Sequence, residues 1–186
     1  APINGRHGWA REVRMVAPRG WLVRRTRLDV DGQVVGPVTA LDHDTMGRIV
    51  RERSLNVEGG LVMNAEGWAT KVQAYDALGR VISVGYSAPE GQVTTRQTVR
   101  TRYGLAGRVE EARVLAPTGE PALGPEGWAF ARRTYDARGR LVALRFFGAD
   151  DTPGLRGHPH VGERHVRDAM GRLLERRAMA AKDVLI

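Results

Sequence analysis

Side-chain character alternates along the stretches that flank a recurring Asp-x-x-Gly motif. In residues 68–75, every second side chain from Trp68 to Ala74 falls on one face of an extended chain. After the motif, residues 81–86 and 141–147 are rich in β-branched and aromatic side chains, which are typical of strands. The pattern therefore predicts two antiparallel strands joined by a tight turn at each copy.

The motif itself predicts the conformation of the turn. Asp at the first position of a type I turn accepts hydrogen bonds from backbone N–H groups of its own turn, and Gly at the fourth position takes the positive φ that returns the chain to the ladder. The turn carboxylates are Asp44, Asp76, Asp136 and Asp168. The turn glycines are Gly47, Gly79, Gly107, Gly139 and Gly171. An alternative is a calcium array, but one carboxylate per turn favours the structural role because calcium takes several oxygen ligands.

The Gly-Arg pair at the end of each turn defines a repeat of about 30 residues, and Gly-Trp-Ala recurs at about twice that spacing. A single hairpin of this size buries too little apolar surface, whereas stacked neighbours share a core. The predicted fold class is all-β, a meander or solenoid of tandem antiparallel hairpins. It forms one domain, 1–186, whose six units span about 7–37, 38–66, 67–97, 98–126, 127–158 and 159–186. The predicted core holds Trp9, Trp68 and Trp128, with Val84, Leu144 and Phe146.

Two C-terminal segments each allow two interpretations. Residues 173–181 suit a strand of the repeat, but their Ala, Leu, Met, Glu and Arg content also suits a short helix. Residues 157–165 hold three of the five His and Glu163, a set that could ligate zinc. Because Gly157 and Pro159 place this segment in a connection between repeats, we expect a polar loop and no metal site.

The charge raises the possibility of an anionic partner. The 186 residues carry a formal net charge of +8, from 29 basic and 21 acidic side chains, with 42% hydrophobic residues and no Cys. A basic chain favours partners such as nucleic acid or an acidic surface. One arginine follows each turn glycine, and such a row could hold phosphates, carboxylates or a glycan, or could pair with the turn carboxylates. The row is Arg48, Arg80, Arg108, Arg140 and Arg172.

Two copies of the turn also carry a family resemblance. The segments 75–81 (YDALGRV) and 135–141 (YDARGRL) resemble the YD repeats of Rhs-type and teneurin-type proteins. The Gly-Trp segments are similar to bacterial repeats of the WG and MORN-like group. The resemblance implies a bacterial β-hairpin array that forms a shell or an interaction module. Because the repeat is already present where the sequence begins, we expect a fragment of a longer chain. Neither the composition nor the resemblance fixes a compartment.

Motifs of known catalytic chemistry are missing from the sequence. It has no Gly-x-Ser-x-Gly, no His-Glu-x-x-His and no phosphate-binding Gly-rich loop, and it has no apolar stretch long enough to span a membrane. We therefore expect a non-enzymatic scaffold without cofactor or metal. It would bind a protein partner or neighbouring repeats of the same polypeptide. The alternative is a module that binds a polyanion or glycan through the arginine row and the repeated aromatic residues.

Overall fold

The computed structural model describes residues 9–94, 96–154, 156–157 and 160–180. The chain divides into two compact units, Ala1–Arg96 and Gln97–Ile186. In their described parts both units consist of strands, turns and connections, without a helix. This confirms the all-β fold class predicted from the alternating pattern.

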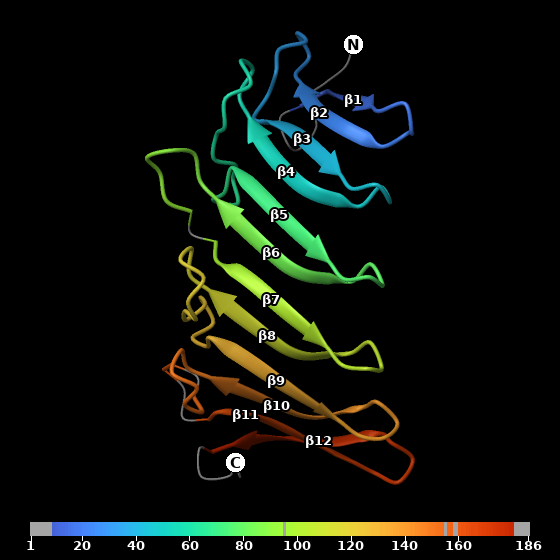
Figure 1. The fold of residues 1–186 in the computed structure, drawn as a ribbon, viewed down its shortest axis with the longest axis vertical. Coiled ribbons are helices and arrows are strands. Elements are labelled where there is room, and N and C mark those ends of the chain that lie inside the picture. Colours follow the sequence, from blue (N-terminus) through green and yellow to red (C-terminus); the bar gives the residue numbers. More distant parts are fainter. Residues whose placement is uncertain (1–8, 95, 155, 158–159, 181–186) are drawn as a thin grey trace. The chain divides into compact units, whose positions relative to one another are not determined.

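Unit 1 is an antiparallel meander of six strands. Each strand pairs with the next one in the sequence, so neighbours along the chain are neighbours in the sheet (Figure 1). The strands are β1 (Arg11–Val16), β2 (Leu22–Leu28), β3 (Val38–His43), β4 (Ile49–Leu55), β5 (Thr70–Tyr75) and β6 (Val81–Ser87).

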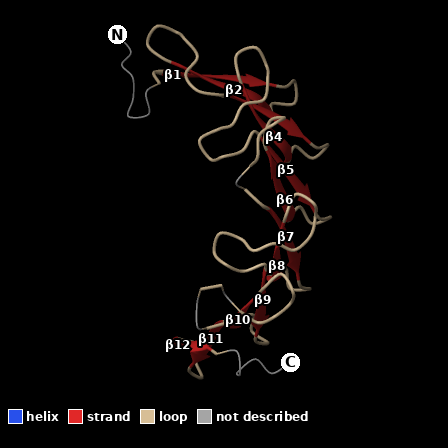
Figure 2. Ribbon diagram, turned by 90° about the vertical axis from the view of Figure 1, so that its left-hand side faces the viewer, coloured by secondary structure: helices blue, strands red, loops and turns tan. Residues whose placement is uncertain are grey.

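Unit 2 repeats this arrangement with six further strands, again paired in sequence order. They are β7 (Thr98–Tyr103), β8 (Val109–Leu115), β9 (Phe130–Tyr135), β10 (Leu141–Phe147), β11 (Gly162–Arg167) and β12 (Leu173–Met179). The C-terminal segment that suited either a strand or a helix is thus the strand β12 as far as Met179. Viewed along the sheet, the strands of each unit form one layer flanked only by turns and connections (Figure 2).

Tight turns join the two strands of each hairpin, and the pairing register shifts by one residue beside each turn. The predicted positive φ is present at all five turn glycines: 80° at Gly47, 78° at Gly79, 74° at Gly107, 75° at Gly139 and 88° at Gly171. Glycine adopts this region without the steric cost that a side chain brings. The turn and the adjacent bulge together reverse the chain within four residues.

The β4–β5 and β8–β9 connections are long and contain the Gly-Trp-Ala motif. Ala69 ends the first of them: its N–H donates to the Ser87 carbonyl, and its own carbonyl accepts from the Ser54 N–H, both at 2.8 Å. Ala129 makes the equivalent bonds with Phe147 and Val114. Each motif alanine therefore bridges two hairpins, and both alanines are fully buried.

The small core differs from the one predicted. Phe130 is 1% exposed and stacks on Phe147, with ring centroids 4.6 Å apart, and Leu123 packs against this pair. Leu144 and Phe146, which the pattern placed in the core, are only partly buried, as is Val84 of unit 1. A single-layer sheet has no partner layer, so a β-branched or aromatic strand position does not by itself imply burial.

Candidate functional site

Four of the six hairpin turns are held by a carboxylate and the arginine four residues later. Asp76 Oδ1 accepts from the backbone N–H groups of Leu78 and Arg80, both at 2.9 Å, and its Oδ2 accepts from Arg80 Nε at 2.6 Å. The same side-chain pair joins three further turns: Asp44 to Arg48, Asp136 to Arg140 and Asp168 to Arg172, each at 2.7 Å. The turn aspartates are thus engaged within their own hairpins.

These contacts favour the charged form of the carboxylates. Hydrogen bonds from the Arg80 backbone and side chain hold the pKa of Asp76 below its usual range, against a smaller desolvation effect. Bonds from the Arg140 backbone and side chain lower the pKa of Asp136 in the same way. A carboxylate that accepts several N–H groups and faces a guanidinium is stabilised as the anion. Each pair is therefore a complete ion pair within its turn.

The arginine also reaches the following hairpin. The Arg48 guanidinium lies over the Tyr75 ring, 4.7 Å from its centroid, and its Nη1 donates to the Asp76 carbonyl at 3.4 Å. In return, the Tyr75 hydroxyl donates to the carbonyl of Ile49 at 2.8 Å. The Tyr-Asp dipeptide therefore joins the hairpin β5–β6 to β3–β4 through a cation–π contact and two hydrogen bonds.

Unit 2 contains the same connector. The Tyr135 hydroxyl donates to the Val109 carbonyl at 2.8 Å, and the Arg108 guanidinium lies over the Tyr135 ring at 5.9 Å. A Cβ atom on Gly139 would overlap this guanidinium, and one on Gly171 would overlap that of Arg140. The turn glycine therefore has a second role, because it leaves space for the arginine of the preceding hairpin. We call this arrangement of arginine, tyrosine and glycine the hairpin connector.

Two hairpin turns depart from the pattern: the β1–β2 turn, which begins at Ala17 and has Trp21 in place of the arginine, and the β7–β8 turn. The turn before β8 begins at Gly104 in place of Asp, so Arg108 has no turn carboxylate. Backbone hydrogen bonds still close this turn, from the N–H of Gly104 to Arg108 O and from the N–H of Gly107 to Gly104 O, both at 2.9 Å. Arg108 keeps its contact with Tyr135. The contact with the next hairpin is thus present even where the aspartate is absent.

The arginine row is largely committed to these structural contacts. Four of its five members pair with a turn aspartate, and only Arg108 does not. The side chains of Arg48 and Arg140 are 26% and 31% exposed, whereas that of Arg172, in the last hairpin, is 75% exposed. A carboxylate 2.7 Å from a guanidinium offsets its charge, so the four paired members attract a polyanion less than free arginines would.

The three Trp residues predicted to form a core occupy different environments. Trp68 is 4% exposed and lies 6.0 Å from the Tyr86 ring, whereas Trp128 is partly exposed and lies 6.2 Å from Phe146. Both indole N–H groups donate to a glutamate two residues earlier. Trp9 is partly exposed, with the Arg27 guanidinium 5.6 Å above its ring.

In the described part of the chain, no group of three or more His, Asp or Glu side chains converges. His158 and Pro159 lie outside the described residues. The His165 side chain is 9% exposed and lies 3.5 Å from the Glu163 carboxylate. Within the described residues, no helix is long and apolar enough to cross a membrane.

Sequence reasoning missed the role of the tyrosines and of one charged cluster. Tyr75 and Tyr135 join hairpins, and the available signal was their place directly before Asp76 and Asp136, two of the four turn aspartates. The cluster around Glu111 had no such signal, because Glu111 and Arg113 lie on β8 whereas Arg132 comes from β9. Glu111 pairs with Arg113 at 2.6 Å and with Arg132 at 3.0 Å.

The sequence matches no family model and no curated protein. The fold is similar to solved structures of TcdB2-TccC3. In the structure of TcdB2-TccC3-Cdc42, the match has a TM-score of 0.51 at 16% identity and covers 91% of this chain but 9% of that chain. TcdB2-TccC3-TEV gives 0.51 at 15% identity, and TcdB2-TccC3 without its hypervariable C-terminal region gives 0.50 at 15%; each covers 92% of this chain and 9% of the other. The chain thus shares an all-β repeat fold with a small part of these much longer chains.

Proposed function

We propose that this chain is a non-enzymatic repeat scaffold, part of a larger β-repeat wall whose first partners are further hairpins of the same kind. The hairpin connector carries this proposal. Arg48 contacts Tyr75 of the following hairpin, and Arg108 contacts Tyr135 in the same direction along the chain. A connector that reaches the following hairpin at both of these places suits a structure that grows by addition of repeats.

The last described hairpin supports the proposal. The Arg172 side chain is 75% exposed, and no following tyrosine covers it among the described residues. Strand β12 pairs with β11 on one side, and all its residues except Met179 are exposed. A further hairpin with the sequence Tyr-Asp-x-x-Gly would pair with this edge and would place its tyrosine beneath Arg172.

Polyanion or glycan binding through the arginine row is the less favoured function. Its four carboxylate-paired members would have to give up an ion pair to hold a phosphate. Heparin binding in graded salt measures this directly, since phosphate-type contacts weaken steeply as salt rises. We expect the arginine row to contribute no salt-dependent heparin binding. The parent chain and the Arg140→Gln variant should therefore behave alike in this assay.

An extension experiment tests the scaffold. The residues after Met179 are replaced by a copy of 148–161 followed by a copy of 130–147, so that a new hairpin can add to β12. We expect the β12 amides to gain protection from hydrogen exchange. A matched extension that carries Tyr135→Leu and Gly139→Val in the copied hairpin should give much less protection. If the unmodified extension leaves the β12 amides as exchangeable as in the parent chain, the edge does not accept repeats and the proposal fails.

A further inference from the structure

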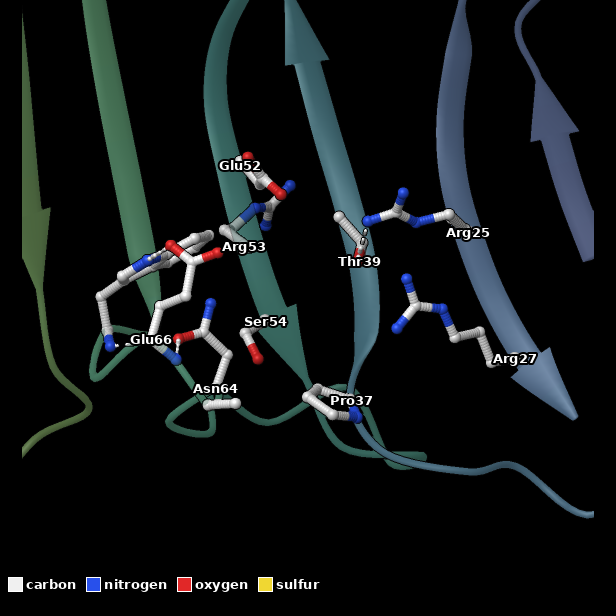
Figure 3. Close-up of a pocket in the computed structure, with 11 residues that line it drawn as sticks. Arg25, Arg27, Pro37, Thr39, Glu52, Arg53, Ser54, Asn64 and Glu66 are labelled. Atoms are coloured by element: carbon white, nitrogen blue, oxygen red, sulfur yellow. Dashed lines mark hydrogen bonds between the residues drawn. The ribbon is translucent and has the colours of Figure 1, made fainter. Parts of the chain in front are cut away.

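A polar hollow of about 230 Å³ lies in unit 1 between β2, β3, β4 and the β4–β5 connection (Figure 3). Arg25 and Arg27 extend from β2 on one side of it, and Asn64 lies on the other. Thr39 of β3 and Ser54 of β4 lie between these walls. Guanidinium, hydroxyl and amide groups from four segments thus converge on one small space.

Several of these groups retain hydrogen-bonding capacity. The Ser54 Oγ is buried without a hydrogen-bond partner among the described residues, which normally costs stability. Arg25 Nη2 makes a long bond of 3.4 Å to Thr39 Oγ1. Arg27 Nε lies 3.8 Å from Glu12 Oε2, beyond hydrogen-bond distance, so this ion pair leaves the guanidinium hydrogen-bond donors available. Asn64 Oδ1 accepts from the backbone N–H groups of Glu66 and Trp68, so the acceptor of this amide is used within its own turn. The NH₂ group of Asn64 is left to donate to a ligand.

The repeat fold does not require these polar groups. The backbone 60 residues later has the same pairing, because Ser54 N–H donates to Ala69 O just as Val114 N–H donates to Ala129 O. Yet four hollow residues have apolar or small counterparts there: Thr39, Glu52, Ser54 and Asn64 correspond to Val99, Ala112, Val114 and Gly124. Val114 is 4% exposed, so unit 2 packs an apolar side chain where unit 1 places a hydroxyl.

We propose that this hollow binds a single carboxylate group, held by Arg25 and Arg27 with hydrogen bonds from Thr39, Ser54 and Asn64. Planar guanidinium groups match carboxylates in geometry as well as charge. The hollow is smaller than the usual 300–1,000 Å³ of drug-sized sites, so it takes one functional group rather than a whole ligand. Glu52 and Glu66 also line it and offset part of the arginine charge, which disfavours a dianion such as phosphate more than a single carboxylate.

The carboxylate can come from a free small organic acid or from an acidic side chain of a protein. Two probes separate these sources: acetate, and the blocked tripeptide acetyl-Gly-Glu-Gly-amide with its Gln analogue as control. Binding is followed on the full chain by NMR shifts of the Thr39, Ser54 and Asn64 amides. We expect saturable shifts with acetate, the Glu peptide or both, and none with the Gln peptide. The responding probe identifies the source.

Three variants assign the response to the hollow. In Arg25→Gln/Arg27→Gln the dissociation constant should rise by about tenfold or more, because the charge-assisted bonds are lost. Ser54→Val installs the side chain that unit 2 carries at this position, so the fold should be kept while binding weakens. Arg24→Gln is the matched control, because Arg24 points to the opposite face of β2 and should leave binding unchanged. The proposal is overturned if neither probe shifts these amides, if the double variant binds as the parent chain does, or if phosphate binds in preference.

Discussion

The β4–β5 and β8–β9 pairs have the same backbone register 60 residues apart but different side chains. Arg53 faces Thr70 in unit 1, and Arg113 faces Phe130 in unit 2. One strand further, Thr70 faces Ser87, whereas Phe130 faces Phe147. Two small hydroxyl residues in one unit thus correspond to the stacked phenylalanines in the other.

The charged residues around these positions differ as well. In unit 1, Arg53 pairs with Asp42 at 2.9 Å. In unit 2, Glu111 holds Arg113 and Arg132, and both guanidiniums lie 5.1 Å from the Phe130 centroid. Burial raises the pKa of Glu111, but the two arginines outweigh it and hold the pKa below the usual value. The two units therefore share the turns and hairpin connectors that maintain the fold, whereas the side chains on the faces of the sheet differ between them.

The largest loss of stability is expected at Phe130, where the side chains of units 1 and 2 differ most. Phe130→Ala should destabilise the protein by about 3–5 kcal/mol, because it removes a buried ring and leaves a cavity under two arginines. The equivalent change in unit 1, Thr70→Ala, should cost less than about 1 kcal/mol. Chemical denaturation of both variants measures the difference. Equal costs would show that the aromatic stack adds nothing to unit 2.

The tryptophans of the two units provide the next comparison. Trp68→Ala should cost about 3–5 kcal/mol, because the indole is buried in the β4–β5 connection. Trp128→Ala should cost clearly less, because Trp128 is partly exposed. Thermal unfolding followed by circular dichroism gives both values. A larger loss for Trp128 would contradict the burial difference between the units.

The turn glycines allow a smaller and sharper comparison. Gly139→Val should cost about 1–3 kcal/mol, because a β-branched residue tolerates positive φ poorly. Gly79→Val should cost less than Gly139→Val, since a Cβ atom at Gly79 would lie 3.5 Å from Arg48 Nη1, an ordinary contact, whereas at Gly139 it would overlap Arg108. Gly91, with φ of 74° and no neighbour within 4 Å, isolates the backbone effect. Equal losses of stability at all three positions would show that the turn glycine is not needed to leave space for the arginine of the preceding hairpin.

The smallest effect concerns the pH dependence of the turn ion pairs. Asp136 has a folded-state pKa below the ordinary 3.8, so its stabilising effect is present above that value and is lost as the pH falls through the folded-state pKa. Asp136→Asn should therefore be less stable than the parent chain at neutral pH, and the two should converge in acid. Asp76→Asn should behave alike in unit 1. Urea denaturation across the acid range tests this, and a difference that is independent of pH would exclude the ion pair as its cause.

The turns could be predicted from the sequence, whereas the packing between hairpins could not. Asp76 and Gly79 act within a few residues, so local turn chemistry determines their conformation. The contact between Arg48 and Tyr75 joins residues on different hairpins. The Tyr-Asp dipeptide marks the tyrosine, but no local pattern identifies its arginine partner. The hollow depends on Arg25, Ser54 and Asn64, which are far apart in sequence and meet only through strand pairing. Burial of Phe130 and partial exposure of Leu144 likewise follow from the single-layer sheet, which alternation alone does not reveal.

The hairpin connector is the central claim, and a double-mutant cycle of Arg48→Met and Tyr75→Leu tests it most directly. The free energy of unfolding is measured for the parent chain, both single variants and the double variant. We expect a coupling energy of about 1 kcal/mol, because the guanidinium lies over the ring of the next hairpin. If the two single effects add without coupling, the arginine and tyrosine do not join neighbouring hairpins, and the account of the repeat is wrong.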